Sequence, residues 1–241
     1  MHPFLAILCG FFLAQLATIA TTTYLHRGST HRAVTFHPVV EFFFQLLLWL
    51  TTGINRQEWC DVHLYHHTYT DKPGDPHSPI LEGLWHVQLG NLFYYRRATR
   101  DPLVKGYAKH IKLSWAERTI FRNNLLGLFI GTALLCNVVG FVPSLIIAGS
   151  HALLYLFFLN NLINGWCHIR GYKNYPNTPA FNNRLIALIT GGEGLHNNHH
   201  ENPGCANLHR KQPAGKFAEI DPGFLLIKLL CSLNLAKITR A

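Results

Sequence analysis

The chain has 241 residues, of which 49% are apolar and only 14% are charged, and its mean hydropathy is +0.11. This balance fits a polytopic membrane protein and argues against a soluble enzyme, while the length is enough for one domain. A formal net charge of +9 would suit nucleic acid or an anionic membrane surface, and the long apolar runs favour the membrane and argue against a nucleic-acid partner. The six cysteines form no C-x-x-C pair, so we interpret them as reduced packing residues.

The first predicted element is a membrane span over residues 3–25. The first charged residue is Arg27, so this uncharged apolar run is long enough to cross a bilayer. A signal peptide is the alternative. It is disfavoured because no basic segment precedes the run and a histidine motif follows it directly.

A second apolar stretch covers residues 38–54. It is short for a span and contains Glu41, so we expect it to lie in the membrane interface or to dip in and return. The region 96–122 that follows later is basic, with Tyr107 and Trp115 among its aromatic residues, as on a surface near lipid headgroups. It carries eight cationic residues: Arg96, Arg97, Arg100, Lys105, Lys109, Lys112, Arg118 and Arg122.

No Asp, Glu, Lys or Arg occurs between Arg122 and Arg170. The interval is too long for one helix, and Gly140 and Pro143 supply turn signals near its middle. We therefore predict spans at about 123–140 and 143–164. The last element, about 222–238, follows Asp221 and begins with Pro, and its mainly apolar surface predicts an interfacial helix.

Histidines gather in four motifs, here called the histidine boxes. An H-x4-H pair follows the first span, an H-x2-H-H motif follows the second apolar stretch, an N-x3-H pair ends the last span, and a second H-x2-H-H lies near the C-terminus. Residues three and four apart share one helix face, whereas H-x4-H is poorer helical spacing and fits a helix end. The box residues are His26, His31, His63, His66, His67, Asn164, His168, His196, His199 and His200.

Five other histidines stand alone and are interpreted as structural. These are His2, His37, His110, His151 and His209.

Neutral imidazole is a good ligand for iron, zinc or copper. Nine box histidines exceed the four ligands of a zinc ion, so we expect two metals with four or five nitrogens each. Hydrolytic two-metal sites usually include bridging carboxylates, and no Asp or Glu lies inside the boxes. The set therefore favours redox iron and oxygen activation.

The boxes must lie on one side of the membrane in order to meet. Arg27, Arg32, Arg56 and the region 96–122 accompany them, whereas the turn at 140–143 carries no charge. The positive-inside rule then places the boxes in the cytoplasm. This arrangement gives three spans with the N-terminus outside.

These residues resemble the membrane fatty-acid desaturase family, the acyl-CoA and acyl-lipid desaturases, over nearly the whole chain. The resemblance is carried by HRGSTHR at 26–32, EWCDVHLYHHTYTDKPGDPHSP at 58–79, NGWCH at 164–168 and GGEGLHNNHH at 191–200. The segments GDPHSP and LHNNHH within these motifs are most similar to the bacterial branch of the family, which implies a bacterial inner membrane. The resemblance implies an all-α integral membrane domain over 1–241, with about three spans, interfacial helices and a cytosolic helical cap carrying the boxes. It also implies two irons (Fe2+) held by the nine box histidines, with Asn164 touching one iron through a water. Trp59 would then lie near the substrate channel.

The implied reaction is O2-dependent desaturation of a saturated acyl chain linked to CoA, a carrier protein or a phospholipid. With no fused cytochrome b5, we expect electrons from a separate donor such as ferredoxin or cytochrome b5 with its reductase. Leu64 and Tyr65 stand where a basic pair is common in the family, and Asn161 stands where the animal enzymes have Trp. An acyl or alkane hydroxylase with the same site is the alternative. A His-rich metal transporter is a remote one, because it would place its ligands at mid-membrane depth.

Overall fold

The computed structural model describes residues 1–210 and 218–239, so part of the predicted single domain at 211–217 and 240–241 lies outside the described residues. The described chain is mainly helical, with one π-helical stretch in its first long helix and two in its second. In chain order the elements are α1 (Pro3–Ala20), η1 (Thr21–Thr30), β1 (Val34–Phe36), α2 (Pro38–Thr51), α3 (Arg56–Tyr69), α4 (Pro79–Glu82), α5 (Leu84–Ala98), α6 (Trp115–Thr119), α7 (Asn124–Val139), α8 (Phe141–Leu153), η2 (Leu154–Leu159), η3 (Leu162–Trp166), α9 (Cys167–Ile169), α10 (Arg184–Ile189), α11 (His196–Glu201), α12 (Pro222–Ser232) and β2 (Ala236–Ile238).

The first helix runs without interruption from Pro3 to Thr30 and is long and apolar enough to cross a membrane. The predicted span ended at residue 25. The helix continues because its polar last turns are buried in the protein, where threonine hydroxyls donate back to carbonyls, as Thr23 does to Ile19. Its start is fixed by His2, whose side chain caps the helix, and by Pro3 in the first turn.

The second long helix, Phe141–Ile169, packs along the first one through small residues. A Cβ atom on Gly10 would come within 1.9 Å of the Ser150 hydroxyl oxygen, so the backbones approach closely there. Nearer the histidines, the Thr21 and Tyr155 hydroxyls are hydrogen-bonded at 2.7 Å. The pair of helices forms a rigid base for the residues at their ends.

Two helices are thus long and apolar enough to cross a membrane, or up to three if a bent pair counts as one, among the described residues. The bent pair is α2 and α3, which meet at 90°. The predicted span at 123–140 corresponds to α7, an apolar helix of 16 residues. At 1.5 Å per residue it is about 24 Å long, short of the roughly 30 Å hydrocarbon core.

The C-terminal segment is a helix followed by a strand, so the predicted helix over 222–238 is wrong after Ser232. Asn234 adopts a left-handed conformation with φ of 57°, which Asn tolerates and which ends the helix. The chain then pairs antiparallel with the strand after the first box, with Val34 opposite Ile238. The domain is therefore not purely helical, because this small sheet ties the C-terminal segment to the N-terminal helix.

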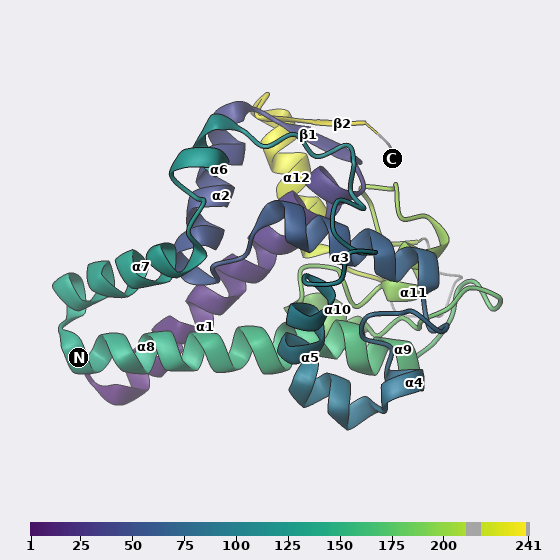
Figure 1. The fold of residues 1–241 in the computed structure, drawn as a ribbon, viewed down its shortest axis with the longest axis horizontal. Helices are drawn as coiled ribbons and strands as arrows, with labels where there is room; N and C mark the ends of the chain where they lie inside the picture. The colour runs from purple at the N-terminus through teal and green to yellow at the C-terminus, as the bar shows by residue number, and fades with distance from the viewer. Residues whose placement is uncertain (211–217, 240–241) are drawn as a thin grey trace.

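Figure 1 shows how these elements separate the molecule into two ends. The N-terminus and the turn between α7 and α8 lie together at one end. The helices α3 and α11, which carry the two H-x2-H-H boxes, lie at the other, with α4, α5 and α9 beside them. The two long helices therefore deliver their last turns to the histidine-bearing end.

Candidate metal centre

The first box lies on the π-helix that ends the first long helix. The His31 backbone N–H donates to the His26 carbonyl at 3.0 Å, an i→i+5 hydrogen bond. Such a bond places residues five apart one above the other, so H-x4-H is the spacing that a π-helix aligns. The predicted helix end at this motif is therefore wrong. The helix continues as a π-helix, and its wider turn accommodates the five-residue spacing.

The second box lies on α3, in regular α-helical geometry. Asn55 caps this helix by accepting from the Glu58 backbone N–H at 3.1 Å. Farther along, Asp61 accepts from the backbone N–H groups of Gly106 and Ala108, which fastens α3 to the loop that follows α5. The spacing of three and four residues then turns His63, His66 and His67 toward one side.

The last box begins α11, a helix of only six residues that depends on its surroundings for its position. The two residues inside the box supply that support, because both side chains are fully buried and hydrogen-bonded. Asn197 accepts from the backbone N–H groups of Asn174 and Tyr175, and Asn198 donates to the Leu208 carbonyl. The histidines on either side are consequently fixed in place.

All nine box histidines lie in two adjoining clusters. Within each cluster, one ring nitrogen of every histidine lies within 4.8 Å of the corresponding atoms of the others. One cluster has five members, His26, His31, His63, His67 and His199, and the other has four, His66, His168, His196 and His200.

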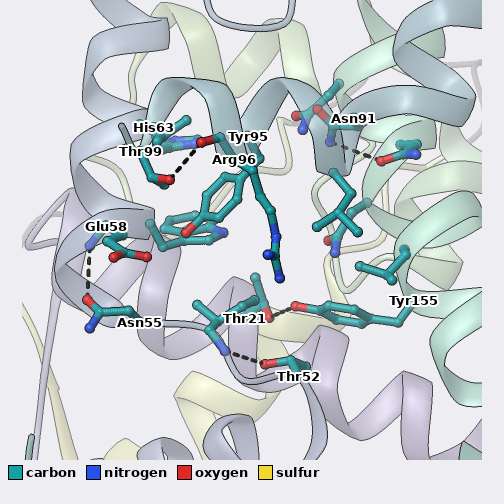
Figure 2. Close-up of a pocket in the computed structure, with 18 of the residues that line it drawn as sticks. Thr21, Thr52, Asn55, Glu58, His63, Asn91, Tyr95, Arg96, Thr99 and Tyr155 are labelled. Carbon is teal, nitrogen blue, oxygen red and sulfur yellow. Dashed lines mark hydrogen bonds between the residues drawn. The ribbon is translucent and has the colours of Figure 1, made fainter. Parts of the chain in front are cut away.

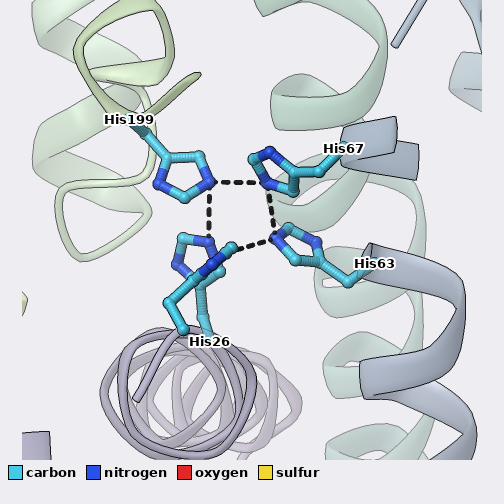
Figure 3. Close-up of side chains that lie close together, drawn as sticks. His26, His63, His67 and His199 are labelled. Atoms are coloured by element: carbon cyan, nitrogen blue, oxygen red, sulfur yellow. Dashed lines mark hydrogen bonds between the residues drawn. The ribbon is translucent and has the colours of Figure 1, made fainter. Parts of the chain in front are cut away.

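Nε2 atoms face one another across the five-histidine cluster (Figure 3). The separations are 3.1 Å from His26 to His199, 2.8 Å from His199 to His67 and 3.0 Å from His67 to His63. The clusters adjoin where the His67 and His200 rings stack at 4.5 Å between centroids.

Three carboxylates hold the outer nitrogen of box histidines. Glu193 lies 2.8 Å from Nδ1 of His26, Asp75 lies 2.9 Å from Nδ1 of His66, and Asp71 lies 2.9 Å from Nδ1 of His168. A carboxylate on one imidazole nitrogen fixes the ring and directs the lone pair of the other nitrogen inward, the arrangement typical of metal-bound histidine. These three residues are not among the predicted site residues, although Asp71 and Asp75 lie within the motif at 58–79 and Glu193 within that at 191–200.

The histidines of α11 are neutral at ordinary pH. Burial, followed by the charge of neighbouring imidazoles, lowers the pKa of His196, His199 and His200 well below the usual value. Burial alone would raise the pKa of the Asp75 carboxyl, but the His66 imidazole beside it outweighs that effect and lowers this pKa. The three histidines of α11 therefore present neutral nitrogen donors, and the carboxylate of Asp75 is ionised.

The arrangement fits metal ions. Lone pairs of neutral imidazoles that converge at about 3 Å repel one another unless protons or a cation lie between them. Nε2 of His66 is buried and has no hydrogen-bond partner among the described residues, as expected of a ligand atom that points at a metal position. The histidine-rich clusters can thus hold metal with the residues that are present.

A cavity of about 420 Å³ adjoins both clusters. His26, His63 and His196 form part of its wall, and Trp59 and Asn164 also line it. Figure 2 shows residues of its wall, with the Thr21–Tyr155 pair on one side and the guanidinium of Arg96 pointing into the space.

Trp59 and Asn164, the two other predicted site residues, both lie beside box histidines. Trp59 stacks on His63, with ring centroids 4.8 Å apart and 10° between the planes. Asn164 lies on the π-helix η3, half-buried, four residues before His168.

The five lone histidines lie outside both clusters. His2 and His37 cap the starts of α1 and α2. His151 and His110 bond the carbonyls of Thr51 and Ser29, and His209 bonds Asn207.

Comparison with known proteins agrees with this site. The family model described as "Fatty acid desaturase" matches residues 1–214. The chain is 32% identical to an acyl-CoA C20 Delta5-desaturase of Anemone leveillei over 95% of its own length and 71% of the relative's. It is 30% identical to an icosanoyl-CoA 5-desaturase of Limnanthes douglasii, over 95% of this chain and 62% of that one. It is also 28% identical to an sn-1 stearoyl-lipid 9-desaturase of a Synechocystis strain, over 94% and 69%. The chain therefore belongs to the fatty acid desaturase family, and like these relatives it is an oxidoreductase of fatty acyl chains.

Proposed function

We propose that this protein is an O2-dependent desaturase that holds two irons in its histidine clusters and inserts a double bond into a saturated acyl chain. The observation that carries the proposal is the convergence of nine imidazoles into adjoining groups of five and four beside a cavity. One iron would take the five-histidine cluster. The other would take the four-histidine cluster, with Asn164 touching it through a water.

Iron is the metal that matches both this donor set and the redox chemistry of the family. Imidazole binds iron, and the carboxylates of the site bond to histidine Nδ1 atoms and leave no bridging carboxylate between the clusters. When bound, the irons would supply the oxidising power of O2 that removes hydrogen from an unactivated methylene. Zinc in a purified sample would not count against iron, because zinc outcompetes ferrous iron at nitrogen sites.

The protein itself would position the acyl chain and exclude water from the reacting carbons. The cavity would hold the acyl chain so that two adjacent carbons face the clusters, and Trp59, stacked on His63, would form the wall beside the reacting carbons. The carboxylates keep the imidazoles oriented. Two electrons would come from a separate donor such as ferredoxin or cytochrome b5 with its reductase.

The acyl carrier is proposed only as a class. The relatives are named for acyl-CoA and acyl-lipid substrates, and a further relative of Moorena producens, 27% identical, is named a hex-5-enoyl-[acyl-carrier protein] acetylenase. We therefore propose an acyl chain carried by CoA, a carrier protein or a phospholipid.

We further propose that the protein crosses a membrane three times, with the clusters on the cytoplasmic side of a bacterial inner membrane. Arg27 lies in η1 beside His26, Arg32 follows His31, and Arg56 begins α3, which carries the second box, whereas the turn between α7 and α8 is uncharged. The basic region 96–122 begins in the last turn of α5. This distribution follows the positive-inside rule.

The function is tested by lipid analysis of cells that express the protein. Cells with the wild type should gain monounsaturated acyl chains at one position, and cells with an equal amount of a cluster-histidine variant should not. Hydroxy-acyl products in place of alkenes would move the assignment to the hydroxylase alternative, with the same site. Accumulation of metal without a change in lipids would favour transport.

Replacing Glu193 by Gln should weaken metal binding at the five-histidine cluster. The amide keeps the size of the side chain but removes the charge that faces His26 and, at 3.5 Å, Arg27. We expect a loss of about 10- to 100-fold in metal affinity or activity, measured by competition with a chelator. Glu82→Gln, at the end of α4 and outside both clusters, is the matched control. Unchanged affinity in Glu193→Gln would show that the carboxylate does not support the ligand.

A further inference from the structure

One buried histidine of the cavity wall belongs to neither cluster. His77 lies in the loop between α3 and α4, is 5% exposed and lines the cavity. Neither of its ring nitrogens has a hydrogen-bond partner within the described part of the chain. Buried polar atoms nearly always have partners, so an imidazole with two unpaired nitrogens at a cavity wall indicates a partner that enters the cavity.

The ring is held firmly beside the four-histidine cluster. It stacks on His66, with centroids 4.7 Å apart and 25° between the planes. Its backbone N–H donates to Asp75 at 3.0 Å, and the next residue, Ser78, donates to Asp71 at 2.7 Å. The two carboxylates that orient His66 and His168 therefore also position His77.

Two simpler roles fit the geometry less well. His66, Asp75 and His77 could together hold a third ion, since their ligand atoms lie within 4.8 Å of one another. However, Asp75 already accepts from Nδ1 of His66, as Glu193 does for His26. A fifth direct ligand of the second metal is also disfavoured, because His77 lies nearly parallel to His66 and outside the set of four converging nitrogens.

We propose that His77 is a positioning residue that would hydrogen-bond a water bound to a metal in the four-histidine cluster. This cluster has one nitrogen fewer than its neighbour and adjoins the cavity through His196, so a metal held there would have room for a non-protein ligand. His77 stands on the same cavity wall with a free nitrogen. The inference rests on the proposed di-iron function and adds a residue that no box contains.

The test uses the whole protein, purified and loaded with ferrous iron, and compares the wild type with His77→Phe and His77→Gln. Phe keeps a flat ring beside His66 but has no nitrogen, whereas Gln keeps one group able to hydrogen-bond. We expect two irons per chain in all three proteins, a shift of one of the two Mössbauer doublets in His77→Phe, and recovery of that doublet in His77→Gln. Desaturation should fall by about 10- to 100-fold in His77→Phe and by less in His77→Gln. The exposed His86→Phe is the control and should match the wild type.

Other outcomes contradict the proposal in distinguishable ways. One iron per chain in His77→Phe would make His77 a direct ligand, and three irons in the wild type with two in the variant would make it part of a third site. Unchanged doublets and activity in His77→Phe would leave it a packing residue. If His77→Phe does not fold, a wild-type spectrum in His77→Gln supports the proposal, and a spectrum with one doublet missing overturns it. A wild type that binds no iron would instead refute the di-iron function itself.

Discussion

His199→Ala is expected to abolish desaturation while the protein still inserts in the membrane. His199 is fully buried, and its Nε2 lies 3.1 Å from that of His26 and 2.8 Å from that of His67, so its ring joins the first box to the second. Removal of this ligand opens the five-histidine cluster, so the metal held there should no longer bind. The helices that pack through Gly10 and Ser150 lie far from this change and should remain together.

The measurement is the ratio of unsaturated to saturated acyl chains at equal protein abundance, together with iron per chain. Product formation should fall to the background of cells without the protein, and iron should fall from two to one. His86→Ala provides the control, because His86 is exposed, lies outside both clusters and bonds the Glu82 carbonyl. Wild-type unsaturation in His199→Ala would refute the di-iron interpretation.

Arg27→Met is expected to be among the most destabilising single substitutions in the chain. The Arg27 side chain is 1% exposed and donates to Asp221 at 3.0 Å and to the carbonyls of Ala206 and Gly191. Methionine fills similar space but leaves the Asp221 carboxylate, also buried, without its cation. Breaking a buried ion pair in this way costs about 3–5 kcal/mol.

The readout is the thermal unfolding midpoint of purified protein in detergent. A loss of this size corresponds to a midpoint lower by about 10 °C for a chain of this length. The double variant Arg27→Met, Asp221→Asn should recover part of the loss, because it removes the unpaired charge. Arg97→Met is the control, since Arg97 is 55% exposed and its contact with Glu82 is 3.4 Å long, a pair worth little. A midpoint of Arg27→Met close to that of the control would contradict the prediction.

Local spacing predicted much of this molecule. The run of uncharged residues before Arg27 predicted a long apolar helix, and the structure has one from Pro3. The i, i+3, i+4 spacing of His63, His66 and His67 predicted one helix face, and α3 provides it. Membership of the desaturase family was also predicted from the boxes and is confirmed by comparison.

Other features depend on contacts between distant segments, which spacing does not encode. The division of nine histidines into five and four brings His66 to one cluster and His63 and His67 of the same motif to the other. The carboxylate that holds Nδ1 of His26 belongs to Glu193, which is 167 residues away in sequence. The strand that follows the last helix forms by pairing with a distant segment, with Ile238 opposite Val34. A periodic apolar pattern gives no sign of any of these.

The widened helical turn at Thr21–Thr30 has a consequence for protein design. An ideal α-helix would rotate His31 away from His26, so a designer who copied the motif HRGSTH onto a regular helical bundle would obtain only one useful ligand from it. A transplanted centre would need the extra residue in that turn, together with the threonines that stabilise it from within. Alternatively, the designer could shorten the motif by one residue and restore regular spacing, which would test whether the unusual turn is needed for the geometry or is one solution among several.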